Sequence, residues 1–298
     1  MAKKKILMVG SGYIANSFIK KNIDNYNFLY SSRNKNLNLN VENLGNLFEL
    51  NSSLDGIHAD SLIFSISVSS FKDTSIDNVN LFLLDLKIFL NKFKHSQIKK
   101  FIFLSSSSLY GLDDNGKKFL EDDVIHADSV YRIEKSKAEK MILDTLTHLP
   151  NKTFVILRIS NPYGAVEKIS NNGVINKAFL DMMNKKPTTI YNSGKSIRDF
   201  IYIDDLLNFI QQSIELNISN NIFNIGSGDG TSLNQMISIV KSQSPEFTYN
   251  IEGSIDDIED SSILDISKAK KLLLYSPKCT LDHGVSLFYK HLKKKFLL

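Results

Sequence analysis

Three side chains whose types and spacing could move a proton lie in two neighbouring segments, residues 105–111 and 131–135. Tyr131 and Lys135 are four residues apart, so on a helix they share one face. The Lys135 ammonium would stabilise a phenolate on Tyr131, and the hydroxyl of Ser106 could hydrogen-bond a substrate carbonyl or alcohol oxygen. Together they would transfer a proton at an oxygen while a hydride is transferred at the carbon that carries it.

The spacing Tyr-x-x-x-Lys occurs three times in the chain, so context must select among the three pairs. The pair that begins at Tyr191 spans Asn-Ser-Gly, which favours a turn. The pair that begins at Tyr289 lies in a basic C-terminal helix with no reactive loop beside it in sequence. Tyr131 alone follows a serine-rich strand end and opens a helical stretch. We therefore predict Ser106, Tyr131 and Lys135 as the catalytic residues.

Apolar runs and helical patterns alternate along the first half of the chain. The expected strands are residues 5–9, 28–30, 61–66, 100–104 and 154–157. Three helices are expected: one that follows residues 10–15 and ends near residue 23, and two over residues 78–93 and 131–147. This alternation predicts an α/β fold with a doubly wound parallel sheet. Residues 36–50 fit either a short helix or a strand.

The second half is less regular and predicts a smaller mixed α/β C-terminal lobe. Its expected elements are helices over residues 174–184 and from residue 204 onward, with strands over residues 199–203 and 222–225. Thr231 or Ser232 could cap a further helix. We divide the chain into a domain of residues 1–165, to which segments from about 196–230 return, and a lobe made mainly of residues 166–298.

The segment Gly10-x-Gly12-x-x-Ala15 follows the first expected strand and opens the first expected helix. This context matches the dinucleotide-binding fingerprint, in which glycines let backbone N–H groups approach a pyrophosphate at a helix N-terminus. The alternative is a plain glycine-rich turn between a strand and a helix. The position near the start of the chain favours the fingerprint, and with it a Rossmann-type domain.

The second expected strand ends in Tyr30-Ser31-Ser32-Arg33-Asn34. Domains that bind NAD usually have an Asp or Glu here for the ribose 2′-hydroxyl, and this segment has neither. Two hydroxyls and a guanidinium suit a 2′-phosphate, because Arg binds phosphate through paired hydrogen bonds. The segment favours NADP(H), with NAD(H) as the alternative if it is only a polar loop. The expected cofactor-binding residues are Gly10, Gly12, Tyr13, Ile14, Ser31, Ser32, Arg33, Ser65, Tyr131 and Lys135.

The composition argues against several other classes of function. The net charge is only +4, and no basic stripe is interleaved with aromatic residues, so nucleic acid is not an expected partner. No apolar run reaches membrane-spanning length, so no membrane partner is expected. Cys279 is the single cysteine, which excludes an internal disulfide and fits a reducing cytoplasm. The six His residues lack metal-ligand spacing, so no metal is expected.

The order of these motifs resembles the extended short-chain dehydrogenase/reductase family, the NAD(P)-dependent nucleotide-sugar epimerase, dehydratase and reductase group. The resemblance covers nearly the whole chain, through residues 10–15, 78–80, 101–111, 131–139, 158–164, 198–205, 224–228 and 264–269. It implies a Rossmann-type cofactor domain and a small C-terminal lobe that binds a nucleotide-sugar. By matching position, Tyr131 is the acid/base, Lys135 is its modulator and a contact of the cofactor ribose, and Ser106 is the oxygen partner.

The same resemblance implies that Ser107, Asn161, Val174 and Arg198 bind the substrate. Arg198 matches a position that often contacts nucleotide phosphates in the family. An ion pair of Arg198 with Asp199 or Asp205 is the simpler alternative. Arg158 could bridge a sheet edge to the second lobe. A later phosphate-binding Arg of the family, expected around residues 252–258, is absent.

Ser107 and Ser108 stand where dehydratases of the family carry Asp and Glu, so elimination of water is not expected. The resemblance and the missing acids favour an NADPH-dependent reductase of a nucleotide-linked 4-keto-sugar. The nearest alternative is a nucleotide-sugar 4-epimerase with tightly bound NAD. A third alternative, from another class, is a catalytically silent NADPH-binding sensor or scaffold protein.

The expected helix over residues 79–93 is apolar almost all round, which indicates burial on more than one side. The resemblance implies a homodimer through this helix and the helix over residues 131–147, across a twofold axis. The alternative is that a loop covers the apolar side chains within one chain. The residues expected at this surface are Leu81, Leu84, Ile88, Leu90, Met141, Leu143 and Leu146.

Overall fold

The computed structural model describes residues 2–32, 41–49, 52–67, 75–113, 116–164, 173–253 and 260–296. The chain forms two compact units, and each consists of three segments. The first unit is Met1–Leu109, Val124–Arg158 and Ser213–Phe223, and the second is Tyr110–Asp123, Ile159–Gln212 and Asn224–Leu298. Helix α5 (Ile203–Glu215) and strand β11 (Asn221–Ile225) each contribute residues to both units.

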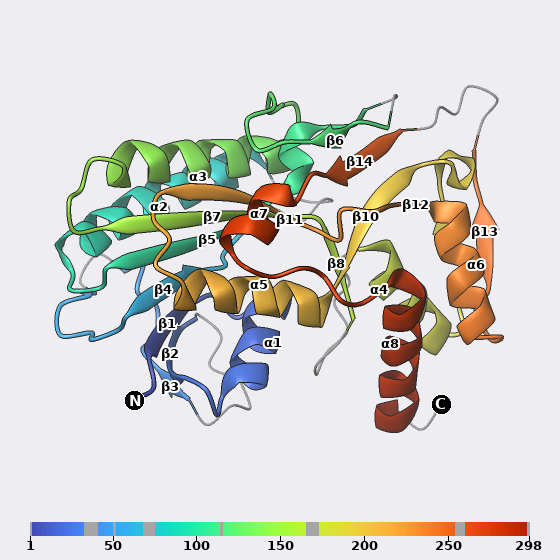
Figure 1. Cartoon of the computed structure of the whole chain (residues 1–298), viewed down its shortest axis with the longest axis horizontal. Coiled ribbons are helices and arrows are strands. Elements are labelled where there is room, and N and C mark those ends of the chain that lie inside the picture. The colour runs from blue at the N-terminus through green and yellow to red at the C-terminus, as the bar shows by residue number, and fades with distance from the viewer. Residues whose placement is uncertain are drawn as a thin grey trace. The chain divides into compact units, whose positions relative to one another are not determined.

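A seven-stranded sheet with the order β11-β7-β5-β4-β1-β2-β3 forms the centre of the first unit (Figure 1). Besides β11, its strands are β1 (Lys5–Val9), β2 (Asn27–Ser31), β3 (Glu42–Asn43), β4 (Ser61–Phe64), β5 (Lys100–Ser106) and β7 (Thr153–Ile159). β1 pairs in parallel with β2 and β4, β2 with β3, and β4 with β5. Every residue of β4 is buried, which explains why Ser61 is followed by three apolar residues without alternation.

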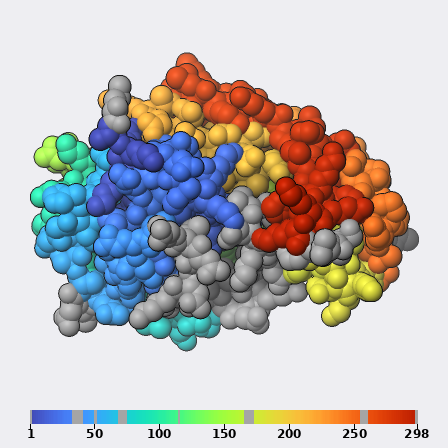
Figure 2. Space-filling model, turned by 90° about the horizontal axis from the view of Figure 1, so that it is seen from below, coloured from blue at the N-terminus to red at the C-terminus, as the bar shows by residue number. Residues whose placement is uncertain are grey.

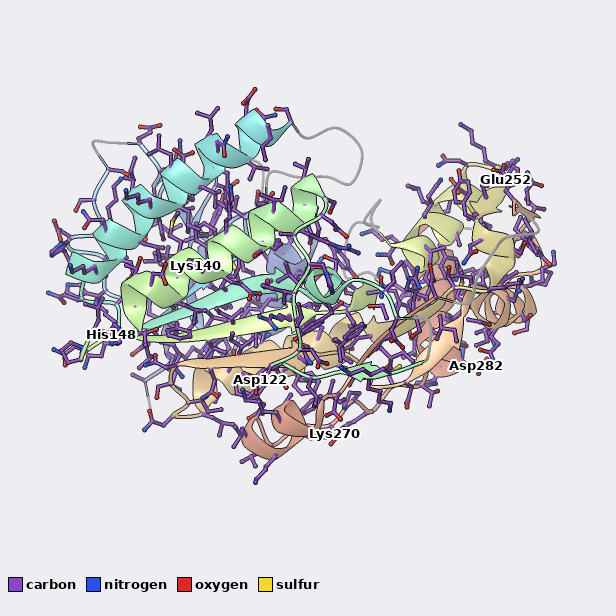
Figure 3. The ribbon with its side chains drawn as sticks, turned by 90° about the horizontal axis from the view of Figure 1, so that it is seen from above. Asp122, Lys140, His148, Glu252, Lys270 and Asp282 are labelled. Atoms are coloured by element: carbon purple, nitrogen blue, oxygen red, sulfur yellow. The ribbon has the colours of Figure 1, made fainter. Side chains whose placement is uncertain are left out.

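The helices of the first unit are α1 (Tyr13–Asn22), α2 (Ile76–His95) and α3 (Val130–Leu146). Ser75 and Ser129 cap α2 and α3, because their hydroxyls accept hydrogen bonds from the N–H groups of Asn78 and Arg132. α2 and α3 lie side by side over one face of the sheet (Figure 3), and α1 lies over the other face (Figure 1). Helices on both faces leave the strand ends as the place where polar side chains can gather.

The second unit contains two smaller sheets. In one sheet the order is β12-β10-β14-β6, with β8 also pairing with β10, and in the other β13 pairs with β9. The strands are β6 (Lys118–Phe119), β8 (Asn161–Tyr163), β9 (Thr188–Ile190), β10 (Ile197–Tyr202), β12 (Gly230–Ser232), β13 (Tyr249–Ile251) and β14 (Ser261–Leu264). The helices besides α5 are α4 (Val174–Met183), α6 (Leu233–Gln243), α7 (Ser267–Leu272) and α8 (Leu281–Phe296). Phe179 of α4 packs on Phe288 of α8, with ring centres 4.7 Å apart.

The observed elements confirm the predicted α/β fold with a large parallel sheet of Rossmann type. Ser232 caps α6 in a reciprocal capping box with Gln235, as one of the two predicted caps. The contact units divide the chain differently from the predicted domains. β6 pairs with β14, so residues 110–123 belong to the second unit, whereas residues 213–223 are the part of the returning segments that joins the first.

The exposed apolar surface that α2 and α3 present is narrower than predicted. Leu90 and Leu146 are 1% and 0% exposed, because both belong to the core between the helices and the sheet. Leu81 and Leu84 are 61% and 55% exposed, so the first unit does not cover them. No helix in the described part of the chain combines the length and apolarity needed to cross a membrane.

Candidate active site

A cavity of about 490 Å³ lies at the carboxyl ends of β1, β2 and β4. β1 pairs with β2 on one side and β4 on the other, so the strand order reverses here, where α/β sheets bind ligands. The lining residues come from residues 2–32, 41–49 and 52–67, the parts of the chain that form neighbouring dark-blue and light-blue surfaces in Figure 2. Its described lining residues are Gly10, Ser11, Gly12, Ser31, Ser32, Asn46, Phe48, Ser65, Ile66 and Ser67.

The two fingerprint glycines serve different needs in this cavity. Gly10 has a φ of +111°, and an added Cβ would lie 2.7 Å from Ser65 Oγ, so only glycine fits there. Gly12 has a φ of −72°, and an added Cβ would meet no atom within 4 Å. The open space beside Gly12 therefore belongs to the cavity. No side chain caps the N-terminus of α1, so the cavity suits the pyrophosphate of a dinucleotide.

The segment expected to choose between NADP and NAD is described only in part. Ser31 Oγ donates to Gly45 O (2.8 Å) and accepts from Leu47 N–H (3.2 Å), so this hydroxyl holds the segment that carries the cavity-lining Asn46 and Phe48. Ser32 Oγ lies 2.7 Å from Ser11 Oγ across the cavity rim. Arg33 lies outside the described residues.

Replacing Gly12 with Val should remove cofactor binding and leave the fold intact. The new side chain meets no neighbouring atom at Cβ, but it enters the space through which a pyrophosphate would approach the backbone. We expect NADPH affinity, measured by fluorescence titration, to fall at least about tenfold, with an unchanged thermal midpoint. Gly10→Ala should instead lower the midpoint, because its Cβ clashes with Ser65. Wild-type affinity in a folded Gly12→Val protein would contradict the cofactor assignment.

Tyr131 and Lys135 occupy one face of α3. Lys135 is 4% exposed, and its Nζ lies 5.9 Å from the centre of the Tyr131 ring and 5.1 Å from that of Phe103. The same Nζ donates to Leu104 O at 3.4 Å, which fixes α3 against the end of β5. A buried ammonium beside the tyrosine ring can stabilise negative charge on its oxygen far better than an exposed one can.

Ser106 is the last residue of β5 and is half-buried. Its Oγ donates to Ser108 Oγ (3.0 Å) and accepts from Ser108 N–H (3.2 Å). Ser107 opens the short 3-10 helix Ser107–Tyr110 and is buried. The turn therefore fixes the Ser106 hydroxyl at a strand end, two residues after the carbonyl that receives Lys135.

A buried ion pair joins the elements that carry these residues. Arg158 at the end of β7 donates from Nη2 to Glu139 Oε2 at 2.8 Å, and Ser105 donates to Glu139 Oε1. Arg158 and Glu139 are 4% and 2% exposed. The guanidinium of Arg158 thus has one partner inside the first unit, and its predicted bridge to the second lobe stays a prediction. Glu139 ties α3 to β5 beside Ser106 and to β7.

The expected substrate-binding residues other than Ser107 belong to the second unit. Asn161 lies in β8 and donates to Asp199 O at 2.9 Å, and Val174 is the first residue of α4. Arg198 lies in β10 and forms an ion pair with Asp260 at 2.7 Å. β8 pairs with β10, so Asn161 and Arg198 come from neighbouring strands.

The simpler alternative, an ion pair of Arg198 with Asp199 or Asp205, is wrong, because Arg198 pairs with Asp260. The Asp199 carboxylate is fully buried and accepts hydrogen bonds from Ser227 and from Gly228 N–H. Burial raises the pKa of Asp199, and these hydrogen bonds oppose the shift. Asp205 is used elsewhere, where it accepts from Tyr275 and from backbone N–H groups.

Cys279 is a poor nucleophile by its surroundings. Burial, together with the nearby carboxylates of Asp205 and Asp204, raises the pKa of its thiol to about 11. The thiolate is the reactive form, so at pH 8 alkylation should be about a hundredfold slower than for an ordinary cysteine. The rate should rise with pH until the thiol titrates, and urea should restore the ordinary rate. Because the chain has one cysteine, a thiol assay on the native protein reads this site alone. Fast labelling at pH 8 would contradict the raised pKa of Cys279.

No group of three metal-ligating side chains occurs among the described residues.

Several residues around the cavity were not predicted. Asn46 and Phe48 come from the segment left open between helix and strand, and Phe48 is held by stacking on Phe89, with ring centres 5.2 Å apart. Ser67 and Ile66 follow β4, and the parallel pairing of β4 with β1 was the available signal for them. Glu134, between Tyr131 and Lys135, gave no signal in a single sequence.

Residues 49–226, more than half of the chain, match the model of the NAD dependent epimerase/dehydratase family. The chain belongs to this family. The family resemblance drawn from the motifs is therefore confirmed, as is the Rossmann-type fold.

One curated protein similar to this chain is the dTDP-4-dehydro-6-deoxyglucose reductase of Escherichia coli. The two sequences are 34% identical over 205 residues, which cover 66% of this chain and 62% of that protein. The UDP-glucose 4-epimerase of Thermotoga maritima, solved with UDP-glucose, superposes with a TM-score of 0.81 at 25% identity over 98% of this chain and 99% of that chain. The UDP-glucuronic acid 4-epimerase of Bacillus cereus, solved with UDP-glucuronic acid and NAD, gives 0.83 at 25% identity over 97% and 99%. The curated match thus spans less than two thirds of that relative, whereas the structural matches span nearly both chains.

Proposed function

We propose that this protein is an NADPH-dependent reductase of a nucleotide-linked 4-keto-sugar. The observation that carries the proposal is the combination, in the first unit, of a dinucleotide-type cavity with the buried Lys135 beside Tyr131. The 34% identity to a dTDP-4-dehydro-6-deoxyglucose reductase supports reduction at C4. Ser107 and Ser108, in place of the two acids of dehydratases, argue against elimination of water.

Each of the three predicted catalytic residues, which all belong to the first unit, has its own task in the proposed reaction. Ser106 hydrogen-bonds the keto oxygen, and Tyr131 donates its phenolic proton to that oxygen as the alcohol forms. Lys135 stabilises the phenolate that remains and contacts the ribose of the cofactor. A nicotinamide cofactor held at the cavity would supply the hydride to C4. Ser107 of the first unit and Asn161, Val174 and Arg198 of the second unit are the proposed substrate-binding residues.

NADP(H) is the proposed cofactor, because the segment after β2 offers hydroxyls and Arg33 and no acid. The alternative is NAD(H), which is bound in the Bacillus cereus epimerase structure. Arg33→Ala should weaken NADPH by roughly ten- to a hundredfold and leave NADH nearly unchanged, because only NADPH carries the 2′-phosphate. Equal effects on both cofactors in a binding titration would refute the preference.

The reducing NADPH pool and the single cysteine make the cytoplasm the proposed location.

A turnover screen tests the proposed reaction. Nucleotide-sugars and their 4-keto derivatives are mixed with the purified protein and NADPH, and the loss of absorbance at the NADPH band is followed. We expect oxidation only with a 4-keto-sugar, with the C4 configuration of the product assigned by NMR. Stoichiometric tightly bound NAD, with no net NADPH oxidation on any keto-sugar, would identify the 4-epimerase instead. The absence of both activities would leave the silent sensor or scaffold.

A homodimer is part of the proposal. Leu81 and Leu84 are 61% and 55% exposed on α2, and Ile88 continues their row at helical spacing. Met141 and Leu143 on the adjacent α3 are partly buried, so they can extend the same surface.

Light scattering at micromolar concentration should give twice the chain mass of 33.7 kDa. The Leu81→Lys/Leu84→Lys protein should be folded and monomeric, because both side chains are exposed within one chain. Val124→Lys, at a residue 75% exposed outside this surface, should remain dimeric. A wild-type mass near that of one chain would refute the dimer.

A further inference from the structure

Glu134 is a buried carboxylate that the proposed reaction does not use. It lies in α3 between Tyr131 and Lys135 and is 0% exposed. Its Oε1 accepts a hydrogen bond from Ser67 Oγ at 2.7 Å and lies 3.9 Å from Lys135 Nζ. The carboxylate therefore joins two groups that serve the candidate active site, one on the cavity wall and one on the catalytic helix.

Burial makes this arrangement costly unless both partners are present. A carboxylate removed from water is tolerated when it is paired with a cation and hydrogen-bonded. Here the cation is the buried Lys135, which otherwise has Leu104 O at 3.4 Å, and the donor is Ser67. The attraction to Lys135 is strong because both groups are shielded from solvent.

Ser67 is the point at which this network reaches the cofactor cavity. Ser67 follows β4, lines the cavity together with Ser65 and Ile66, and is exposed to solvent. A surface serine on a strand-end segment keeps one backbone position only if something fixes it. The buried acceptor on α3 does so, because the bond to Glu134 spans 67 positions of sequence.

We propose that Glu134 is a positioning residue of the cofactor site. Through Ser67 it holds residues 65–67 in the shape that binds the dinucleotide, and through Lys135 it fixes the ammonium beside Tyr131. This inference rests on the proposed function only in assigning the cavity to a nicotinamide cofactor. Its first consequence concerns cofactor affinity, and its second concerns the rate at saturating cofactor.

A double-mutant cycle tests the bridge to Ser67. Ser67→Ala and Glu134→Met each remove the hydrogen bond, and Met preserves the length of the side chain. We expect each to weaken NADPH or NADH, whichever the wild type binds, by about three- to tenfold in a fluorescence titration. The loss in the double variant should fall well short of the sum of the two single losses, because both substitutions remove the same Ser67–Glu134 hydrogen bond. Glu134→Gln keeps an acceptor for Ser67 and should restore affinity to within about twofold of wild type.

The charge on Glu134 has a separate readout. Glu134→Gln should lower kcat by about tenfold at saturating cofactor, because Lys135 loses its anionic neighbour, although the same variant keeps its cofactor affinity. A purely structural role would reduce the folded fraction, seen by thermal melting, without this split between affinity and kcat.

Unchanged cofactor affinity in folded Ser67→Ala, or additive losses in the double variant, would overturn the proposal. If Glu134→Met does not fold, Ser67→Ala with Glu134→Gln still decides it, because both alter groups without removing packing. Failure of the wild type to reduce any keto-sugar would refute the proposed reaction and not this inference, since the affinity measurements need no turnover.

Discussion

Replacing Tyr131 with Phe is expected to reduce turnover by about 10²–10⁴-fold while the cofactor still binds. The substitution keeps the aromatic ring 5.9 Å from Lys135 Nζ and removes only the hydroxyl that would carry the proton. The variant lacks the proposed proton donor, so the chemical step slows. Steady-state kinetics with a 4-keto-sugar, together with an NADPH titration, measures both effects.

The control for this variant is Tyr191→Phe. Tyr191 has the same spacing to a lysine but is 66% exposed in the second unit. Its removal should leave kcat unchanged. If Tyr131→Phe retained wild-type turnover, the proton donor would be another group. If both variants lost activity equally, the loss would not report on the acid at all.

Replacing Glu139 with Ala should cost the protein about 3–5 kcal/mol of unfolding free energy. Arg158 would remain 4% exposed with its carboxylate partner gone, and Ser105 would lose its acceptor. A buried charge that has lost its carboxylate partner is much more costly than the pair that it came from. Urea unfolding followed by far-UV circular dichroism gives the change in free energy.

The matched control is Asp144→Ala on the same helix. Asp144 pairs with Lys140 at 2.9 Å, but their side chains are 61% and 75% exposed. Removing such an exposed pair should change stability by less than about 1 kcal/mol. The double variant Glu139→Leu/Arg158→Met should be more stable than Glu139→Ala, because it removes both charges. Equal losses in Glu139→Ala and Asp144→Ala would contradict the buried network.

The fold was predictable because its strands carry their signal locally. β4 is fully buried and β5 is buried at all but its two end residues, so each contains a short apolar run, residues 62–64 and 101–104. Ser232 marked the start of α6, and the glycines after β1 marked the start of α1. The domain boundaries were harder to predict, because the two-residue strand β6 is too short to have a period, and only its pairing with β14 assigns residues 110–123 to the second unit.

The candidate site was predictable where chemistry depends on spacing and not where it depends on long-range contacts. Tyr131 and Lys135 share a face because they are four apart on one helix. The partner of Arg198 was missed because Asp260 is 62 residues away and reaches it only through the pairing of β10 with β14. Glu139 and Glu134 look like surface acids in sequence, and only their burial reveals that one binds Arg158 and the other Ser67.

The most direct test of the central claim is the fate of a deuterium label. NADPH labelled at C4 of the nicotinamide, in each stereochemical form, is incubated with the protein and the 4-keto-sugar that it turns over. The proposed reductase transfers one deuterium from one of the two forms to C4 of the product sugar, with one NADP⁺ formed for each product. Absence of deuterium from the sugar, with NAD bound stoichiometrically to the purified protein, would contradict the account and favour the 4-epimerase.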